Sequence, residues 1–143
     1  MPLTDPILTP PGAGESSSYG SGSGARLLAG GPQTGSDYGV VLYHVKAGDE
    51  PPYHTHTRED ETVYLLKGEI TAYLDGQKIE VPEGSYAALP KGVPHGFRVK
   101  GEEATLLISL YPAGAERFFV PEAGSGEPNP ADFGLEMLGD LPD

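Results

Sequence analysis

The stretch His54-Thr55-His56-Thr57-Arg58-Glu59-Asp60-Glu61 decides how this sequence is interpreted. Side chains of a β-strand alternate between its two faces, so histidines two residues apart in a strand point to the same face. Glu61 heads the next apolar segment, and His95 opens another one directly after the turn Pro90-Lys91-Gly92-Val93-Pro94. Three imidazoles and one carboxylate can therefore meet at one point.

The surrounding sequence predicts an all-β protein. Between residues 38 and 111, short segments rich in Val, Ile, Leu and Tyr are separated by regularly placed Gly and Pro. Asp75-Gly76 predicts a two-residue type I′ hairpin turn, and only residues 115–119 resemble a helical turn. Many short strands without intervening helices favour a sandwich, a jelly roll or a small barrel. We expect strands at residues 25–29, 39–46, 54–56, 61–67, 69–74, 77–81, 85–89, 95–99 and 104–111.

Glycines and a proline frame the four candidate ligands at fixed spacing. Gly48 and His54 are separated by five residues, His56 and Glu61 by four, and Glu61 and Gly68 by six. The second group is Gly84, five residues, Pro90-Lys91-Gly92, two residues and His95, and it begins after an interval of 15 residues. Both groups resemble the two sequence motifs of the cupin superfamily. One departure is Val99, which stands where the family often has an Asn that is not a metal ligand.

The resemblance implies a cupin double-stranded β-helix, a jelly-roll barrel, here with one short C-terminal helical turn. It also implies that His54, His56, Glu61 and His95 bind one divalent transition metal. This set of nitrogen and oxygen donors suits Ni, Fe, Mn, Co, Cu or Zn, and the sequence does not choose among them. Residues 19–28, 112–119 and 133–139 are similar to the flanking segments of small single-domain cupins that resemble bacterial quercetin 2,3-dioxygenases.

Composition divides the chain of 143 residues into three parts. Residues 1–18 are rich in Pro, Gly and Ser and are expected to form a flexible arm, while residues 19–120 form the barrel. If the flanking resemblance holds, the Ser/Gly stretch leads into an ordered strand. Residues 121–143 carry six acidic residues and no Lys or Arg, and we expect this tail to pack on or near the barrel.

The resemblance implies a metal-dependent dioxygenase that cleaves a C–C bond of a flavonol or another enolisable phenol with O2. If Glu61 swings off the metal, its carboxylate would act as the general base for the substrate hydroxyl. Counting alternate positions from the ligands puts Val63, Leu65, Phe97 and Val99 on the inner face, where they line a substrate pocket or simply form core. Two alternatives stay open: a metal-dependent cyclase, isomerase or epimerase of a polyketide-like or sugar substrate, and a non-enzymatic cupin that binds a small molecule.

Two groups of polar residues lie outside the metal-ligand pattern. His44 belongs to neither motif and is expected to be a surface or hydrogen-bonded histidine. The charged run Arg58-Glu59-Asp60 is interpreted as a solvated loop, with a brace for His56 as the alternative. Tyr53 and Tyr64 have the opposite strand parity and are assigned to packing or to a dimer contact.

Charge and cysteine content exclude several classes of function. The chain has 21 acidic and 9 basic residues and a net charge of −12, which disfavours nucleic acid and anionic membranes as partners. It has no Cys, so disulfides, iron–sulfur clusters and thiol nucleophiles are excluded. No long apolar run predicts a membrane span and no leader pattern is visible, so we expect a cytoplasmic protein. The resemblance implies a homodimer.

Overall fold

The computed structural model describes residues 3–142 and consists mainly of antiparallel β-strands. The all-β prediction is confirmed. The strands are β1 (Ser16–Tyr19), β2 (Ser23–Ala29), β3 (Gly39–Lys46), β4 (Tyr53–His56), β5 (Asp60–Leu74), β6 (Gln77–Val81), β7 (Tyr86–Leu89), β8 (His95–Tyr111) and β9 (Leu135–Gly139). Three single-turn helices complete the fold: α1 (Gly31–Thr34), α2 (Glu116–Phe119) and the 3-10 helix η1 (Pro130–Phe133).

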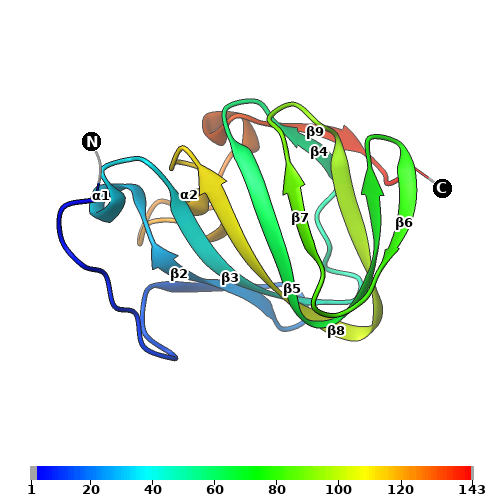
Figure 1. The fold of residues 1–143 in the computed structure, drawn as a ribbon, viewed down its shortest axis with the longest axis horizontal. Coiled ribbons are helices and arrows are strands. Elements are labelled where there is room, and N and C mark those ends of the chain that lie inside the picture. The colour runs from blue at the N-terminus through cyan, green and yellow to red at the C-terminus, as the bar shows by residue number, and fades with distance from the viewer. Residues whose placement is uncertain (1–2, 143) are drawn as a thin grey trace.

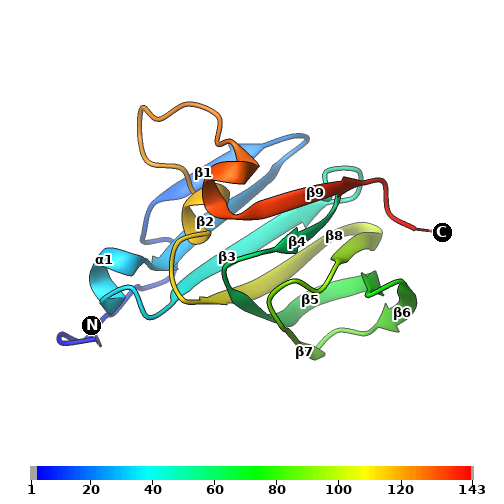
Figure 2. The ribbon, with the colours of Figure 1, turned by 90° about the horizontal axis from the view of Figure 1, so that it is seen from above.

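The strands form one curled sheet around an apolar interior. Their order is β1-β2-β3-β8-β4-β9, and β5 pairs with β6, β7 and β8 (Figure 1). Figure 2 shows β4 and β9 on one side of the molecule and β5, β6 and β7 on the other. Buried Val41, Leu65, Leu106 and Leu110 belong to the cluster that fills the space between them. This is the jelly-roll arrangement that the strand pattern predicts.

Two long strands replace four expected short ones. β5 and β8 pair along their whole length, from Asp60 opposite Tyr111 to Leu74 opposite His95. Gly68 was expected to end a strand, but with φ of 87° it lies within β5 where the pairing register shifts. A Cβ at Gly68 would lie 2.6 Å from the carbonyl oxygen of Glu103, so the backbones approach too closely for a side chain. The glycine therefore marks a bulge rather than a turn.

Both ends of the described chain add strands to the sheet. β1 pairs with β2, so residues 16–18 of the expected arm are part of the sheet. Ser17 Oγ donates to the carbonyl oxygen of Phe119 at 2.6 Å and joins β1 to α2. Within the acidic tail, β9 pairs with β4, which carries two of the candidate ligands. The sequence analysis expected neither strand, because β1 is rich in Ser, which is common in loops, and β9 is rich in Leu, Met and Glu, which favour helices.

The helices are short and connect strands. Asp75 and Gly76 both have positive φ, 50° and 82°, as the predicted type I′ turn requires. Among residues 3–142, no helix is long and apolar enough to cross a membrane.

A buried carboxylate ties α1, α2 and β3 together. The Glu116 side chain is buried, with Oε2 accepting from the Gly31 amide at 2.9 Å and Oε1 accepting from the Gly114 amide at 2.6 Å. A Cβ at Gly39 would lie 2.4 Å from Oε1 of the same side chain, so the start of β3 packs directly on it. The buried Gly31 amide and the exposed Gly114 amide therefore both depend on this one residue.

We predict that Glu116→Gln lowers the free energy of unfolding by about 1–3 kcal/mol, because the buried side-chain amide nitrogen cannot accept a hydrogen bond and would face the N–H of Gly31 or of Gly114 instead. Urea denaturation measures the change. The matched control is Glu122→Gln, the same substitution at an exposed position, which should change stability by less than about 0.5 kcal/mol. Equal stability of the two variants would contradict this role of Glu116.

Candidate metal centre and cavity

Three strands bring the candidate ligands together. β4 carries His54 and His56, β5 carries Glu61 near its start, and β8 begins at His95, which lies opposite His54 in the sheet. All four residues are buried. One ring nitrogen from each histidine lies within 4.8 Å of those of the other two, as a shared metal ion requires.

Glu61 belongs to the same cluster. Its Oε1 lies 3.2 Å from His56 Nε2 and 2.9 Å from His95 Nε2. Among the described residues, none of these three buried atoms has a hydrogen-bond partner in acceptable geometry. Buried polar atoms without partners are rare in proteins and require a physical explanation.

The opposite ring nitrogens explain which atoms are available to a cation. His54 Nδ1 lies 2.7 Å from the carbonyl oxygen of Pro52, and His95 Nδ1 lies 3.0 Å from that of Val93. A carbonyl oxygen only accepts, so each Nδ1 carries the proton and donates it. In the neutral ring Nε2 then holds a lone pair, which is the form that binds metals.

Lone pairs therefore converge at one buried point. A neutral His95 ring whose acceptor Nε2 lies 2.9 Å from a carboxylate oxygen is repelled by it, so this contact requires either a proton on Nε2 or a metal cation between or beside the two atoms. Three imidazole nitrogens and one carboxylate oxygen suit Ni, Fe, Mn, Co, Cu or Zn. The residues present thus fit a divalent metal, and His54, His56, Glu61 and His95 would hold it.

The pKa values of His54, His56 and Glu61 are shifted in different directions. Burial, together with His95, lowers the pKa of His54 to about 4, so this ring is neutral at pH 7. Burial would also lower the pKa of His56, but the carboxylates of Glu59 and Glu61 outweigh it and raise that pKa to about 9. Burial opposes ionisation of Glu61, whereas contacts with His56 and His95 hold its pKa well below its ordinary value. The metal-free cluster therefore already attracts positive charge.

Glu59 is a residue whose role the sequence analysis assigned wrongly. It was expected in a solvated loop, but its side chain is 2% exposed and its Oε1 accepts from His56 Nδ1 at 3.1 Å. The alternative interpretation, a brace for His56, is the one that the structure supports. The carboxylate fixes the tautomer and orientation of the ring and makes Nε2 a better ligand. Its position three residues after His56 was the available signal.

The neighbouring charged residues are exposed to solvent, as expected, although Asp60 is the first residue of β5 rather than part of a loop. Arg58 and Asp60 are exposed; Arg58 donates to the carbonyl oxygen of Asp132 at 3.0 Å, and Asp60 accepts from the Lys91 amide at 2.9 Å. His44 is partly exposed and contacts Thr105 Oγ1 at 3.2 Å, away from the ligand cluster.

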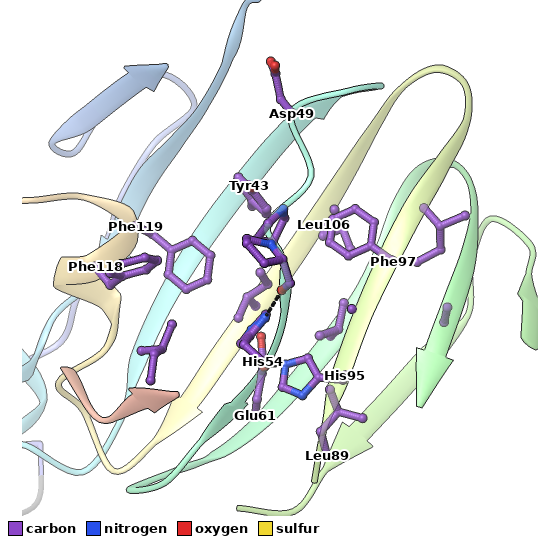
Figure 3. Close-up of a pocket in the computed structure, with 18 of the residues that line it drawn as sticks. Tyr43, Asp49, His54, Glu61, Leu89, His95, Phe97, Leu106, Phe118 and Phe119 are labelled. Atoms are coloured by element: carbon purple, nitrogen blue, oxygen red, sulfur yellow. Dashed lines mark hydrogen bonds and ion pairs between the residues drawn. The ribbon is translucent and has the colours of Figure 1, made fainter. Parts of the chain in front are cut away.

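A large apolar cavity opens beside the ligands. Its volume is about 840 Å³, and His54, Glu61 and His95 line it (Figure 3). Val63, Leu65 and Phe97, which parity assigned to the inner face, line it as well. Val99 is not among the lining residues and packs against the core cluster instead. Aromatic side chains that the parity argument did not identify are Tyr19, Tyr43, Tyr86, Phe118 and Phe119.

The Asp, Glu, Lys and Arg residues that line the cavity in the described part of the chain are all acidic. Asp49, Glu61, Glu80 and Glu127 line it, while no Lys or Arg in the described part of the chain does so. Away from the metal-binding cluster, a phosphate or a carboxylate bound here would lack a cationic partner and would be repelled by these groups. The cavity therefore suits a neutral, largely apolar ligand.

The fold and the ligand cluster define a cupin. Residues 41–111 match the family described as the cupin domain, and the chain belongs to the cupin superfamily as a small cupin that resembles quercetin 2,3-dioxygenase. The resemblance to that enzyme is measured by 32% identity to quercetin 2,3-dioxygenase of Bacillus subtilis over 102 residues. These residues are 71% of this chain but 30% of the Bacillus protein, so the chain spans less than a third of that relative.

Solved structures show the same fold. An RmlC-like cupin from Shewanella frigidimarina is 21% identical, with a TM-score of 0.66 over 81% of this chain and 98% of that one. The polyketide cyclase RemF of Streptomyces resistomycificus is 25% identical, with a TM-score of 0.55 over 62% of this chain and 64% of that one. The predicted double-stranded β-helix is thereby confirmed.

We predict that Glu59→Gln weakens Ni²⁺ or Zn²⁺ binding about 10- to 100-fold, because the neutral amide orients His56 less firmly and supports a less basic ring. Isothermal titration calorimetry of the metal-free protein measures the affinity. Glu102→Gln, at an exposed position, is the control and should leave it unchanged. Unchanged affinity in Glu59→Gln would show that the carboxylate does not support the site.

Proposed function

We propose that this cupin is a metal-dependent oxygenase that cleaves a C–C bond of a flavonol or another enolisable phenol with O2. The observation that carries the proposal is the position of His54, Glu61 and His95 in the wall of an apolar cavity of about 840 Å³. That volume lies within the roughly 300–1,000 Å³ typical of sites for molecules of drug size. The similarity to the Bacillus subtilis quercetin 2,3-dioxygenase supports the same chemistry.

Glu61 is the proposed general base. Its lowered pKa keeps the carboxylate ionised at neutral pH but makes it a weak base, so the proposed role depends on its position beside a substrate hydroxyl. It lines the cavity and is held between two imidazoles, which fixes Oε1 at the edge of the apolar space. Removing the enol proton makes the substrate electron-rich and prepares it to react with O2.

The remaining cavity residues orient the substrate and exclude water. Val63, Leu65 and Phe97 come from the two long strands, β5 and β8, and pack against the same apolar core. A flat aromatic ring buries its faces against such side chains without a polar penalty. A bound metal would supply Lewis-acid polarisation and a template for the substrate oxygens.

The acidic wall also weighs against some alternatives. Away from the metal-binding cluster, the anionic groups of sugar phosphates and uronic acids would meet no Lys or Arg among the described lining residues. A metal-dependent cyclase of a neutral polyketide-like substrate is the second candidate, because the polyketide cyclase RemF is similar in fold at 25% identity. Consumption of O2 separates the two functions.

We predict that metal-loaded protein consumes O2 as it consumes a flavonol, measured with an oxygen electrode across the six candidate metals. Glu61→Gln should retain metal through the three histidines and lose at least about 100-fold in turnover, the usual contribution of a general base. Glu69→Gln, at an exposed position on the same strand, is the matched control and should behave as wild type.

Two outcomes would contradict the proposal. Flavonol turnover without O2 uptake would favour the cyclase or isomerase class. Undiminished turnover in Glu61→Gln with metal bound would show that Glu61 is not the base.

A further inference from the structure

The cavity contains a polar group that the metal-binding cluster does not use. Tyr19, Tyr43 and Asp49 line it, and Figure 3 places Tyr43 and Asp49 toward one end of the drawn residues and Glu61 and His95 toward the other. The Tyr43 side chain is 4% exposed and lies on β3, whereas Tyr19 comes from β1. A ligand that reaches both ends of the cavity would meet the side chains of Tyr43 and Tyr19 at the end remote from the imidazoles.

The protons of the two phenols can be assigned. Tyr19 Oη contacts the backbone carbonyl of Asp49 at 3.2 Å, and because a carbonyl only accepts, Tyr19 donates its proton there. The Tyr19 and Tyr43 hydroxyls form a short hydrogen bond with each other. Since the single hydroxyl proton of Tyr19 is donated to the Asp49 carbonyl, Tyr43 is the donor in the hydrogen bond between the two hydroxyls. Tyr43 Oη is left with acceptor capacity and no proton to offer a ligand.

Packing holds this acceptor in a fixed place. The Tyr43 ring meets Phe119 edge to face at 5.3 Å between centroids and stacks on Tyr19 at 6.4 Å. Asp49 is anchored by three hydrogen bonds: its Oδ2 accepts from Ser21 N at 2.8 Å, Ser21 Oγ at 3.0 Å and Ser23 Oγ at 2.6 Å. Burial raises the pKa of Tyr43, so the phenol stays neutral and keeps its proton on the bond to Tyr19. An acceptor with a fixed position selects for a donor on the ligand.

We propose that Tyr43 is a specificity-determining residue whose hydroxyl oxygen accepts a hydrogen bond from a second hydroxyl, at the substrate end remote from the imidazoles. This inference rests on the proposed function and narrows its substrate class to neutral phenolic enols with a free distal hydroxyl. A methoxy group at that position has no proton to donate, so it leaves Tyr43 Oη unpaired and is disfavoured. Tyr19 is a positioning residue, because it fixes the direction of the Tyr43 proton.

The test compares flavonols that differ only in the distal substituent: hydroxyl, methoxy or hydrogen. Binding to Zn²⁺-loaded protein without O2 is followed by flavonol absorbance. Wild type should prefer the hydroxyl form over both others by about 10-fold, the effect of one buried hydrogen bond. Tyr43→Phe should abolish this preference while binding the hydrogen form normally. Tyr73→Phe, a buried tyrosine that is not among the lining residues, is the matched control and should keep the preference.

A second variant keeps the proposal falsifiable if Tyr43→Phe does not fold. In Tyr19→Phe the proton of Tyr43 is released and can point to the ligand, so the penalty for the methoxy form should shrink. An unchanged hydroxyl preference in either variant overturns the role of Tyr43 and leaves the proposed function intact, since O2 uptake is measured separately. If no flavonol binds wild type, both proposals are overturned.

Discussion

The structure depends on the convergence of buried lone pairs at one point. Three imidazole nitrogens and Oε1 of Glu61 lie close together. Of these atoms, Nε2 of His56, Nε2 of His95 and Oε1 of Glu61 are buried without a hydrogen-bond partner among the described residues, and burying such groups without compensation costs several kcal/mol. A divalent cation bound to these atoms would remove this cost. Its binding would stabilise the folded state by about 2.7 kcal/mol when the free metal concentration is 100 times Kd. The cluster therefore couples the stability of the barrel to its function.

The curled sheet is what makes this convergence possible. Glu61 and His95 lie at opposite ends of the β5–β8 pairing, yet the bulge at Gly68 and the curl of the sheet allow both to reach the His54-Thr55-His56 strand. β9 covers the outer edge of that strand, so the tail helps to hold the ligands as well as to close the barrel. Glu59, beneath His56, completes the support from outside the cavity.

The sequence predicted the fold class and the ligand cluster because both follow from short-range patterns. Alternation within a strand puts His54 and His56 on one face, and Gly and Pro mark most turns. A sequence does not distinguish a glycine with positive φ inside a strand from a glycine in a turn. The sequence analysis therefore predicted two short strands in place of β5 and two in place of β8. β1 and β9 exist because long-range pairing overrides weak local propensity. Tyr19 was not predicted to line the cavity because tertiary contacts bring it there, whereas Glu59 was assigned to a solvated loop although its spacing from His56 also allowed the brace that the structure shows.

The central claim is that these four side chains hold one metal ion. Anomalous diffraction from crystals of protein loaded with Ni²⁺ or Zn²⁺ tests it most directly. The account predicts a single strong peak within ordinary coordination distance, roughly 2.0–2.2 Å, of His54, His56 and His95 Nε2 and of a Glu61 oxygen. A loaded crystal with no peak at this point, or with its peak on other residues, would contradict the account.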